Sequence, residues 1–553
     1  MIEKSPQNFF SKLCCILLII IVFILMYQPW KLSLREVQGN EGFYATVMQE
    51  VNFESYPVVT AHNVKVRNSY FLYPHLCRFL QDKFSLGIEE PLRYTAFFWA
   101  VAIALSAGIT AGALRSFKAG LVAFSFFLGC NFVFEKSVLA NPTTMAVFFV
   151  FLSHISWVYF GFIKTKWNTA WLTSLILLSV AFLCNGFISI IYFAVPLLFT
   201  HRPLKVFSKL SKSGFIVGGI ILLGVVLLWF VPYLRGNDYG TINYTIFHAQ
   251  RLGEWLLHIV YTPFEMIVRL LPWTFIAWLP FCVALRPLDE TPVMSHYFRV
   301  LFFSEFIIAL VNPFGNIICI IYSLAPLAVL CGLSYDIGVR RYSEEIRKLI
   351  VLCSYIAIGL GIATIVYCFI PNSLLKNDLP TFSLGILFLL QAFWIYRYRK
   401  RGQIWLIMLS ISCSIGLFYY ATMYKYRIKH TLRREIGETI HNSLHADKDV
   451  KWKDKKPIYT LNIAGFYNEA VYIEHPIIKV NSLSELPKNE PSVYLLSVGF
   501  PQYRERSWIN LMRTSYQDTG ISLWRGDLLP ESELINRDFS IDNEGEKSEK
   551  NGN

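Results

Sequence analysis

Acidic and basic side chains occupy opposite ends of one polar segment, residues 35–74. Its acids come early, Glu36, Glu41, Glu50 and Glu54, and its bases Lys65 and Arg67 come late. A carboxylate can orient or deprotonate an attacking hydroxyl, or hold a divalent cation. Lysine and arginine bind phosphate, and arginine does so best because its planar fork matches the phosphate oxygens. The segment therefore has the residue types for a transfer reaction on a phosphate-bearing substrate.

A second polar stretch, residues 235–263, adds His248, Arg251 and His258, and Arg269 follows within an apolar run. Arginines inside a membrane are costly, and they are commonly paired or line a cavity. We interpret the adjacent Glu135 and Lys136 as an ordinary loop pair.

The composition places these residues in a membrane protein. The chain has 553 residues, of which 54% are hydrophobic and 16% charged, and its mean hydropathy is +0.43. Soluble proteins are closer to a quarter charged. The net charge of +13 does not indicate nucleic-acid binding, because the basic residues gather in short loops between apolar runs, where they set topology.

Apolar runs of the length that spans a bilayer predict about 13 helices. The first, Leu13–Tyr27, lacks a small-residue cleavage site and is predicted to stay in the protein. The others are expected near 94–114, 119–134, 143–163, 168–184, 187–200, 214–234, 264–285, 298–314, 317–335, 349–370, 381–396 and 403–421. Loops on alternate sides are rich in Lys and Arg, which predicts a cytoplasmic N-terminus and a C-terminus outside.

Three parts are therefore expected: a transmembrane domain over 1–423 with a first outer loop over 28–93, a small extracytoplasmic α/β domain over 424–535, and a disordered acidic tail over 536–553. In the α/β domain we predict strands in 457–463, 470–480, 492–500 and 521–526, and a helix near 504–514. The few cysteines lie mostly in apolar runs, so no disulfide framework is expected.

Ordered motifs over roughly residues 10–425 resemble the GT-C glycosyltransferases of the protein O-mannosyltransferase and lipid A aminoarabinose transferase type, which use dolichyl- or undecaprenyl-phosphate sugars. The segment NEGFYATVMQEV resembles their first-loop motif, with Glu41 in the acidic place. KVRNSYFLYP resembles the basic motif that follows. The longest piece, FHAQRLGEWLLHIVYTPFEMIVRLLPWTF, keeps the family order at Arg251, Gly253, His258, Pro263 and Pro272-Trp273-Thr274.

Three positions depart from the family pattern. Asn141 stands where an aspartate is expected, Asn185 stands where a lysine is expected, and the segment NPFGNIICIIYSLAPLAVLCG lacks the lysine of the family's tenth span. These departures leave open a different donor, a different use of metal, or lost activity.

The resemblance implies a role for each candidate residue. Glu41 is expected to be catalytic, and four cations are expected to bind the donor lipid phosphate: Lys65, Arg67, Arg251 and Arg269. Further active-site candidates are Tyr44, Asn141, His248 and His258. For the cofactor two alternatives stay open: none, or a divalent cation, Mg²⁺ or Mn²⁺.

The expected function is transfer of a sugar from a polyprenyl-phosphate donor to lipid A, a glycan or a protein, at the outer face of a bacterial inner membrane. The expected partners are that donor, the acceptor and membrane lipids, with no nucleic acid. Two alternatives stay open: a transporter or flippase of lipid-linked sugars, and a catalytically inactive relative that only binds them.

Overall fold

The structure is a computed structural model, and its chain forms two compact units. The described residues are 16–17, 20–21, 23–24, 27, 36–51, 59–65, 72–137, 139–200, 206–235, 252–312, 317–370, 379–398, 406, 409–414, 416–417, 432–446, 456–463, 465–503, 505–516 and 519–529. The helical unit comprises Met1–Arg35 and Arg67–His430, and the sheet unit comprises Glu36–Val66 and Thr431–Asn553. Each is described by itself.

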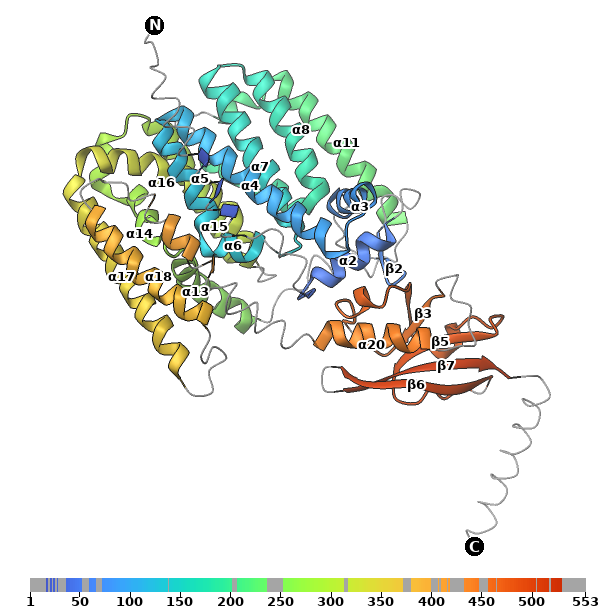
Figure 1. Cartoon of the computed structure of the whole chain (residues 1–553). Helices are drawn as coiled ribbons and strands as arrows, with labels where there is room; N and C mark the ends of the chain where they lie inside the picture. The colour runs from blue at the N-terminus through green and yellow to red at the C-terminus, as the bar shows by residue number, and fades with distance from the viewer. Residues whose placement is uncertain are drawn as a thin grey trace. The chain divides into compact units, whose positions relative to one another are not determined.

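The helical unit consists of packed helices (Figure 1), and most of them follow the predicted apolar runs. Its α-helices are α3 (Leu72–Phe84), α4 (Glu89–Leu114), α5 (Phe117–Gly129), α6 (Asn131–Ser137), α7 (Pro142–Val158), α8 (Trp167–Asn185), α9 (Phe187–Phe199), α11 (Ser213–Arg235), α13 (Leu252–Arg269), α14 (Thr274–Ala277), α15 (Pro292–Val311), α16 (Ile320–Arg341), α17 (Ser343–Phe369) and α18 (Leu379–Tyr398). Short 3-10 or π turns are η3 (Tyr159–Ile163), η4 (Val206–Lys209), η5 (Leu279–Phe281), η6 (Val283–Leu288) and η7 (Ile317–Cys319).

Among the described residues, seven helices are long and apolar enough to cross a membrane, or nine if two bent pairs each count as one span. The runs predicted at 187–200 and 381–396 form shorter apolar helices. The predicted first and last spans lie mostly outside the described residues. The prediction of an all-α polytopic membrane protein is confirmed.

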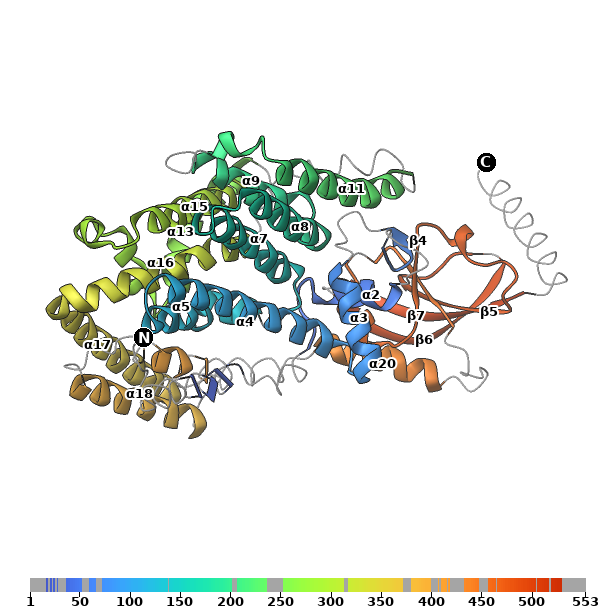
Figure 2. The same cartoon turned by 90° about the horizontal axis from the view of Figure 1, so that it is seen from above.

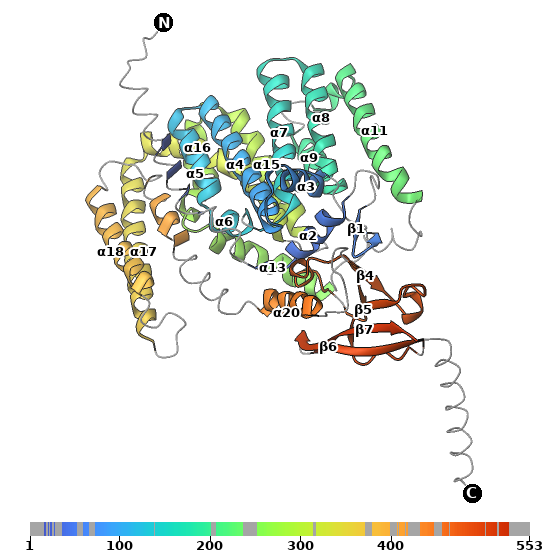
Figure 3. The ribbon, with the colours of Figure 1, turned by 45° about the vertical axis from the view of Figure 1, so that its right-hand side comes forward.

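Close helix packing organises this unit. Helices α7, α8 and α11 lie side by side in Figures 1 and 3, and α17 lies along α18 in Figure 2. Helix α16 is the central one, with every residue from Ile320 to Gly338 buried. A Cβ on Gly332 would lie 2.4 Å from the carbonyl oxygen of Ala119, so this glycine lets α16 approach α5 closely.

Two predicted spans are bent. The run 119–134 divides into α5 and α6 at an angle of 59°. The run 264–285 is not one continuous helix: α13 ends at Arg269, and the chain resumes as α14 after a bend of 117°. Pro272 lies in the break and Pro280 follows it, and neither has the amide N–H that a continuous helix needs.

The sheet unit contains a five-stranded sheet in the order β4-β3-β5-β7-β6. Its elements are α20 (Leu432–Ala446), β3 (Ile458–Leu461), η9 (Ala470–Tyr472), β4 (Ile477–Val480), η10 (Leu483–Glu485), β5 (Ser492–Val498), β6 (Arg506–Tyr516) and β7 (Thr519–Leu528). Strand β3 is parallel to β4 and β5, while β7 is antiparallel to β5 and β6. The predicted small α/β region is confirmed.

Alternation along β5 shows how the sheet is buried on both faces. Tyr494 and Leu496 pack in one apolar cluster with Ile440 and Leu444 of α20. Val493 and Leu495 belong to the cluster on the other side. Helix α20 therefore covers one face of the sheet.

The helix predicted near 504–514 is wrong, because the segment forms strand β6. Its large apolar residues Trp508, Leu511 and Met512 have the three- and four-residue spacing of a helix face. The register with β7 shifts between Asn510 and Met512, and a bulge of this kind interrupts the alternation by which a strand is recognised.

The start of the first outer loop folds with the C-terminal segment. Its elements are α2 (Glu41–Glu50), β1 (Thr60–Ala61) and β2 (Val64–Lys65), and Val47, Val59 and Ala61 pack against Tyr467. The sequence placed this loop in the membrane domain, whereas the structure includes Glu36–Val66 in the sheet unit. The outer boundaries at 423 and 535 stay predictions, and the predicted tail 536–553 lies outside the described residues.

Candidate functional site

Within the helical unit, the two bent helix pairs meet at their breaks. The backbone N–H of Asn131, at the start of α6, donates to the carbonyl oxygen of Leu271 at 3.4 Å. The thiol of Cys130 donates to the carbonyl oxygen of Arg269 at 3.5 Å. Irregular backbone at membrane depth must find such partners within the protein, and broken helices commonly line binding sites.

Trp273 fills the space between the breaks and is fully buried. Its Nε1 donates to Ser412 Oγ at 3.0 Å. A Cβ on Gly129 would lie 2.6 Å from the same Nε1, so only glycine fits at the end of α5. The hydroxyl of Thr274 donates to the carbonyl oxygen of Ile267 at 2.7 Å. Because α13 ends at Arg269, this carbonyl has no N–H partner within the helix, and Thr274 supplies one.

A group of four charges lies beside these breaks, and we call it the Arg269 cluster: Glu135, Lys136, Glu265 and Arg269. Arg269 donates to Glu135 at 2.7 Å and forms an ion pair with Glu265 at 2.5 Å. Lys136 pairs with Glu135 at 2.8 Å. Glu135 therefore pairs with Arg269 as well as with Lys136. Our interpretation of Glu135 and Lys136 as only an ordinary loop pair is wrong.

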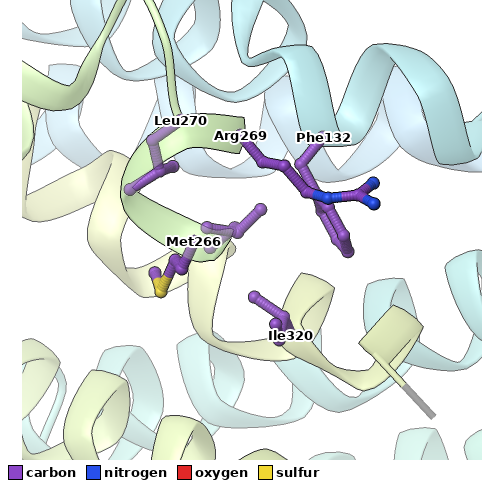
Figure 4. A pocket seen from close by; sticks show the side chains of 6 residues that line it. Phe132, Met266, Arg269, Leu270 and Ile320 are labelled. Carbon is purple, nitrogen blue, oxygen red and sulfur yellow. The ribbon is translucent and has the colours of Figure 1, made fainter. Parts of the chain in front are cut away.

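The guanidinium of Arg269 also contributes to a small, mostly apolar pocket (Figure 4). The pocket is lined by Phe132, Met266, Arg269, Leu270, Ile320 and Leu324. The guanidinium lies 5.6 Å from the ring centroid of Phe132. A guanidinium has five N–H donors, so two ion pairs leave donors that a phosphate oxygen can accept. An apolar wall next to such donors suits a lipid phosphate.

The carboxylates of this cluster do not fit a Mg²⁺ or Mn²⁺ site as they are arranged. Glu135 and Glu265 both contact Arg269, and Glu135 also contacts Lys136. A divalent cation there would be opposed by two positive charges at ion-pair distance.

Glu41, the predicted catalytic acid, lies in the sheet unit at the first position of α2 and is 3% exposed. Its Oε2 accepts the backbone N–H of Gln38 at 3.0 Å. Asn468 holds the same turn: its Oδ1 accepts the N–H of Gly42 at 3.0 Å, and its Nδ2 donates to the carbonyl oxygen of Gly39 at 3.1 Å. The position of Glu41 therefore depends on a residue of the C-terminal segment.

The hairpin that carries Lys65 is held by Glu50. Its carboxylate accepts the N–H groups of His62 at 2.6 Å and Asn63 at 3.1 Å, two residues with the positive φ values of 54° and 61° that a tight hairpin turn needs. The ring of His62 stacks on Tyr467 at 4.8 Å. Burial, and then the charge of Lys479, lower the pKa of His62 to about 4. For Lys65 the structure describes the backbone, which pairs with Thr60.

The remaining predicted residues are distributed as follows. Asn141 is the N-cap of α7, where its Oδ1 accepts the N–H of Thr143 at 2.7 Å. His258 Nδ1 lies 3.1 Å from Thr262 Oγ1. Tyr44 is half-buried beside Phe43. Arg67, His248 and Arg251 lie outside the described residues.

The structure joins two of the departing motifs. Asn185 Nδ2 donates to the hydroxyl of Tyr322 at 3.1 Å, and Tyr322 belongs to the predicted tenth-span motif. Both side chains are neutral, so this contact lacks the charge that a lysine at position 185 would add.

Sequence reasoning missed Glu265 and Asn468, and it misjudged Glu135. Glu265 had a usable signal, because it lies four residues before Arg269 in one helix and such residues face each other. Asn468 had none, since it lies 426 positions from Gly42.

No protein-family model matches the sequence, and no curated protein matches it. Solved structures do match. ArnT from Cupriavidus metallidurans bound to undecaprenyl phosphate has 12% sequence identity and a TM-score of 0.71, covering 92% of this chain and 97% of that chain. The same protein in the apo state has 13% identity and a TM-score of 0.71, covering 93% and 98%. This chain therefore has the fold of ArnT, a lipid A aminoarabinose transferase of the GT-C class.

Proposed function

We propose that this membrane protein with the ArnT fold is a glycosyltransferase that moves a sugar from a polyprenyl-phosphate donor to an acceptor at the outer face of a bacterial inner membrane. The observation that carries the proposal is the fold match over 92% of the chain to a structure bound to undecaprenyl phosphate. The Arg269 cluster supports it, because a guanidinium beside an apolar pocket suits a lipid phosphate.

In the proposed reaction, an acceptor hydroxyl attacks the anomeric carbon of the donor sugar. The bond from that carbon to the phosphate oxygen breaks, and the lipid phosphate leaves with the bonding electrons. Glu41 orients the hydroxyl and takes its proton. Arg269 stabilises the charge on the leaving phosphate. Lys65, Arg67 and Arg251 are the further proposed phosphate ligands, and Tyr44, Asn141, His248 and His258 are proposed neighbours.

The proposed orientation follows from the loop charges: the N-terminus is cytoplasmic, and residues 424–535 lie outside. A donor already attached to a lipid carrier suits this side, since nucleotide sugars stay in the cytoplasm. Lipid A, a glycan and a protein are the proposed acceptor classes.

A relative that binds the lipid-linked sugar without transferring it is the second candidate. Two positions that depart from the family pattern favour it, because Asn141 caps a helix and Asn185 bonds to a neutral tyrosine. Transfer chemistry, rather than binding, separates this candidate from the first.

The test is sugar transfer by the full chain in lipid nanodiscs, supplied with a panel of polyprenyl-phosphate sugars and candidate acceptors. Products are followed by mass spectrometry of the lipid, glycan and protein fractions. We expect transfer by the wild type and a loss of roughly 100-fold or more in Glu41→Gln, the range of a lost general base. Glu438→Gln, which alters an exposed acid of the same unit, is the matched control and should transfer like the wild type.

Two results would contradict the proposal. Wild-type protein that binds a polyprenyl phosphate but transfers no sugar in the panel supports the binding-only candidate. Transfer by Glu41→Gln at the wild-type rate removes Glu41 from the catalytic role. Thermal unfolding of each variant confirms that the protein compared is folded.

A further inference from the structure

Three histidines gather on one side of the sheet unit. His441 and His445 lie four residues apart on α20, so they share one face of the helix. His475 lies between η9 and β4. The ring centroids are separated by 4.3 Å for His441 and His445, 6.2 Å for His441 and His475, and 5.9 Å for His445 and His475. One ligand nitrogen from each ring lies within 4.8 Å of the other two.

Backbone carbonyls select the tautomer of two of these rings. His441 Nδ1 lies 2.9 Å from the carbonyl oxygen of Ile473, and His475 Nδ1 lies 3.1 Å from that of Lys456. A carbonyl oxygen only accepts, so each Nδ1 carries the hydrogen and each neutral ring has its lone pair on Nε2. Histidines that ligate metals typically donate their other N–H to such a partner, which fixes the ring and raises its basicity.

The surrounding fold positions these side chains. Ile440 and Leu444, next to the two helical histidines in sequence, are fully buried in the core and fix the rotation of α20. Glu474 has a positive φ of 61°, which few non-glycine residues adopt, and this turn directs the chain into His475. His445 is exposed, so an ion can reach the group from solvent.

We propose that His441, His445 and His475 bind one divalent transition-metal ion, with zinc as the ion that fits best. Imidazole suits Zn²⁺, and three histidines with an open fourth position form a common tetrahedral site. Bonds of about 2.0–2.1 Å to zinc would bring the nitrogens to about 3.4 Å from one another. Reaching that spacing requires small rotations of the three side chains. The ion would join α20 to the segment that precedes β4.

The test uses the full chain purified in nanodiscs with an affinity tag that contains no histidine. Bound metal is counted by mass spectrometry after titration with ZnCl₂ and gel filtration, and thermal unfolding is recorded with and without zinc. We expect about one zinc per chain and a higher unfolding temperature with zinc, because the ion binds the folded form. Bound Co²⁺ should give the strong visible absorption of a four-coordinate ion.

His445→Ala is the main variant, since an exposed side chain can be removed without disturbing the core, and His475→Gln is the second. Loss of an outer-shell partner of a metal ligand typically weakens metal binding by roughly 10–100-fold. Each variant removes a ligand itself, so it should weaken zinc binding by at least that much. His296→Ala, at an exposed histidine of α15, is the matched control and should bind zinc like the wild type. Wild-type protein without stoichiometric zinc, or both variants with unchanged affinity, would overturn the proposal. None of these readouts depends on sugar transfer.

Discussion

The side chain of Asn468 accepts the backbone N–H of Gly42 at 3.0 Å, across 426 positions of sequence. A Cβ on Gly42 would lie 2.5 Å from the Cα of Asn468, so the two backbones touch at this point. The turn that carries Glu41 is therefore built partly by the C-terminal segment.

Replacing Asn468 tests this dependence. Asn468→Ala leaves the buried N–H of Gly42 without its acceptor, which costs about 1–3 kcal/mol of unfolding free energy. We expect lower stability of the sheet unit and faster hydrogen exchange in residues 36–50, measured by mass spectrometry. Asn468→Asp keeps the acceptor and loses the donor, so it should fall between wild type and alanine. Asn442→Ala, at an exposed position of α20, is the control; equal exchange in all four proteins would contradict the role of Asn468.

The Arg269 cluster makes opposite predictions for its acid and its base. Glu135→Gln removes a negative charge that competes for Arg269, so binding of undecaprenyl phosphate should tighten. Arg269→Ala should weaken that binding roughly 10-fold or more, as expected for about 1.5–3 kcal/mol per charged hydrogen bond. Binding is measured by calorimetry in nanodiscs.

The control for this pair of variants is Arg78→Ala. Arg78 forms an exposed ion pair with Asp82 at 3.1 Å, and such pairs contribute little. If Arg269→Ala binds the lipid as tightly as Arg78→Ala does, Arg269 is not a phosphate ligand.

Gly129 should tolerate no side chain, because its Cβ would lie 2.6 Å from Trp273 Nε1. Gly129→Ala should cost about 1–3 kcal/mol through overpacking and should shift the fluorescence of the buried tryptophan. Gly224→Ala, in α11, meets nothing within 4 Å and should unfold at the wild-type temperature or slightly above it. A stable Gly129→Ala protein would show that the contact between the two breaks can relax.

His62 predicts a pH dependence of stability. Its folded pKa is lowered to about 4, below the value of about 6.5 of an unfolded histidine, so the folded form resists its protonation. The contribution of His62 to the unfolding free energy is therefore complete above about pH 6.5. It is lost as the pH falls toward 4, and the total loss is about 3 kcal/mol.

The measurement is the unfolding free energy of wild type and His62→Gln from about pH 7.5, one unit above the unfolded pKa, down to about pH 4, the folded pKa. Burial raises the pKa of Glu36 and Glu469 in the same unit. Protonation of these two carboxyls therefore increases the unfolding free energy as the pH falls, which opposes the effect of His62. The difference between the two proteins isolates His62. It should change with pH by about 3 kcal/mol, and a constant difference would exclude this coupling.

Much of the helical unit could be predicted from sequence alone. The runs that became α4, α7, α8, α15 and α16 were recognised because a bilayer requires each span to satisfy its backbone hydrogen bonds internally, so hydropathy over about 20 residues is sufficient. Strands β3, β5 and β7 were recognised by alternation and β-branched or aromatic residues.

The tertiary structure decided what depends on partners distant in sequence. Strand β6 pairs with β7 through a bulge that hides its period, and Arg269 finds Glu135 at a separation of 134 positions. The turn of Glu41 is completed by Asn468. The local sequence pattern predicts the secondary structure of a segment and the burial of its side chains. An ion pair or a hydrogen bond between distant residues exists only once the fold has brought their atoms within about 3 Å of each other.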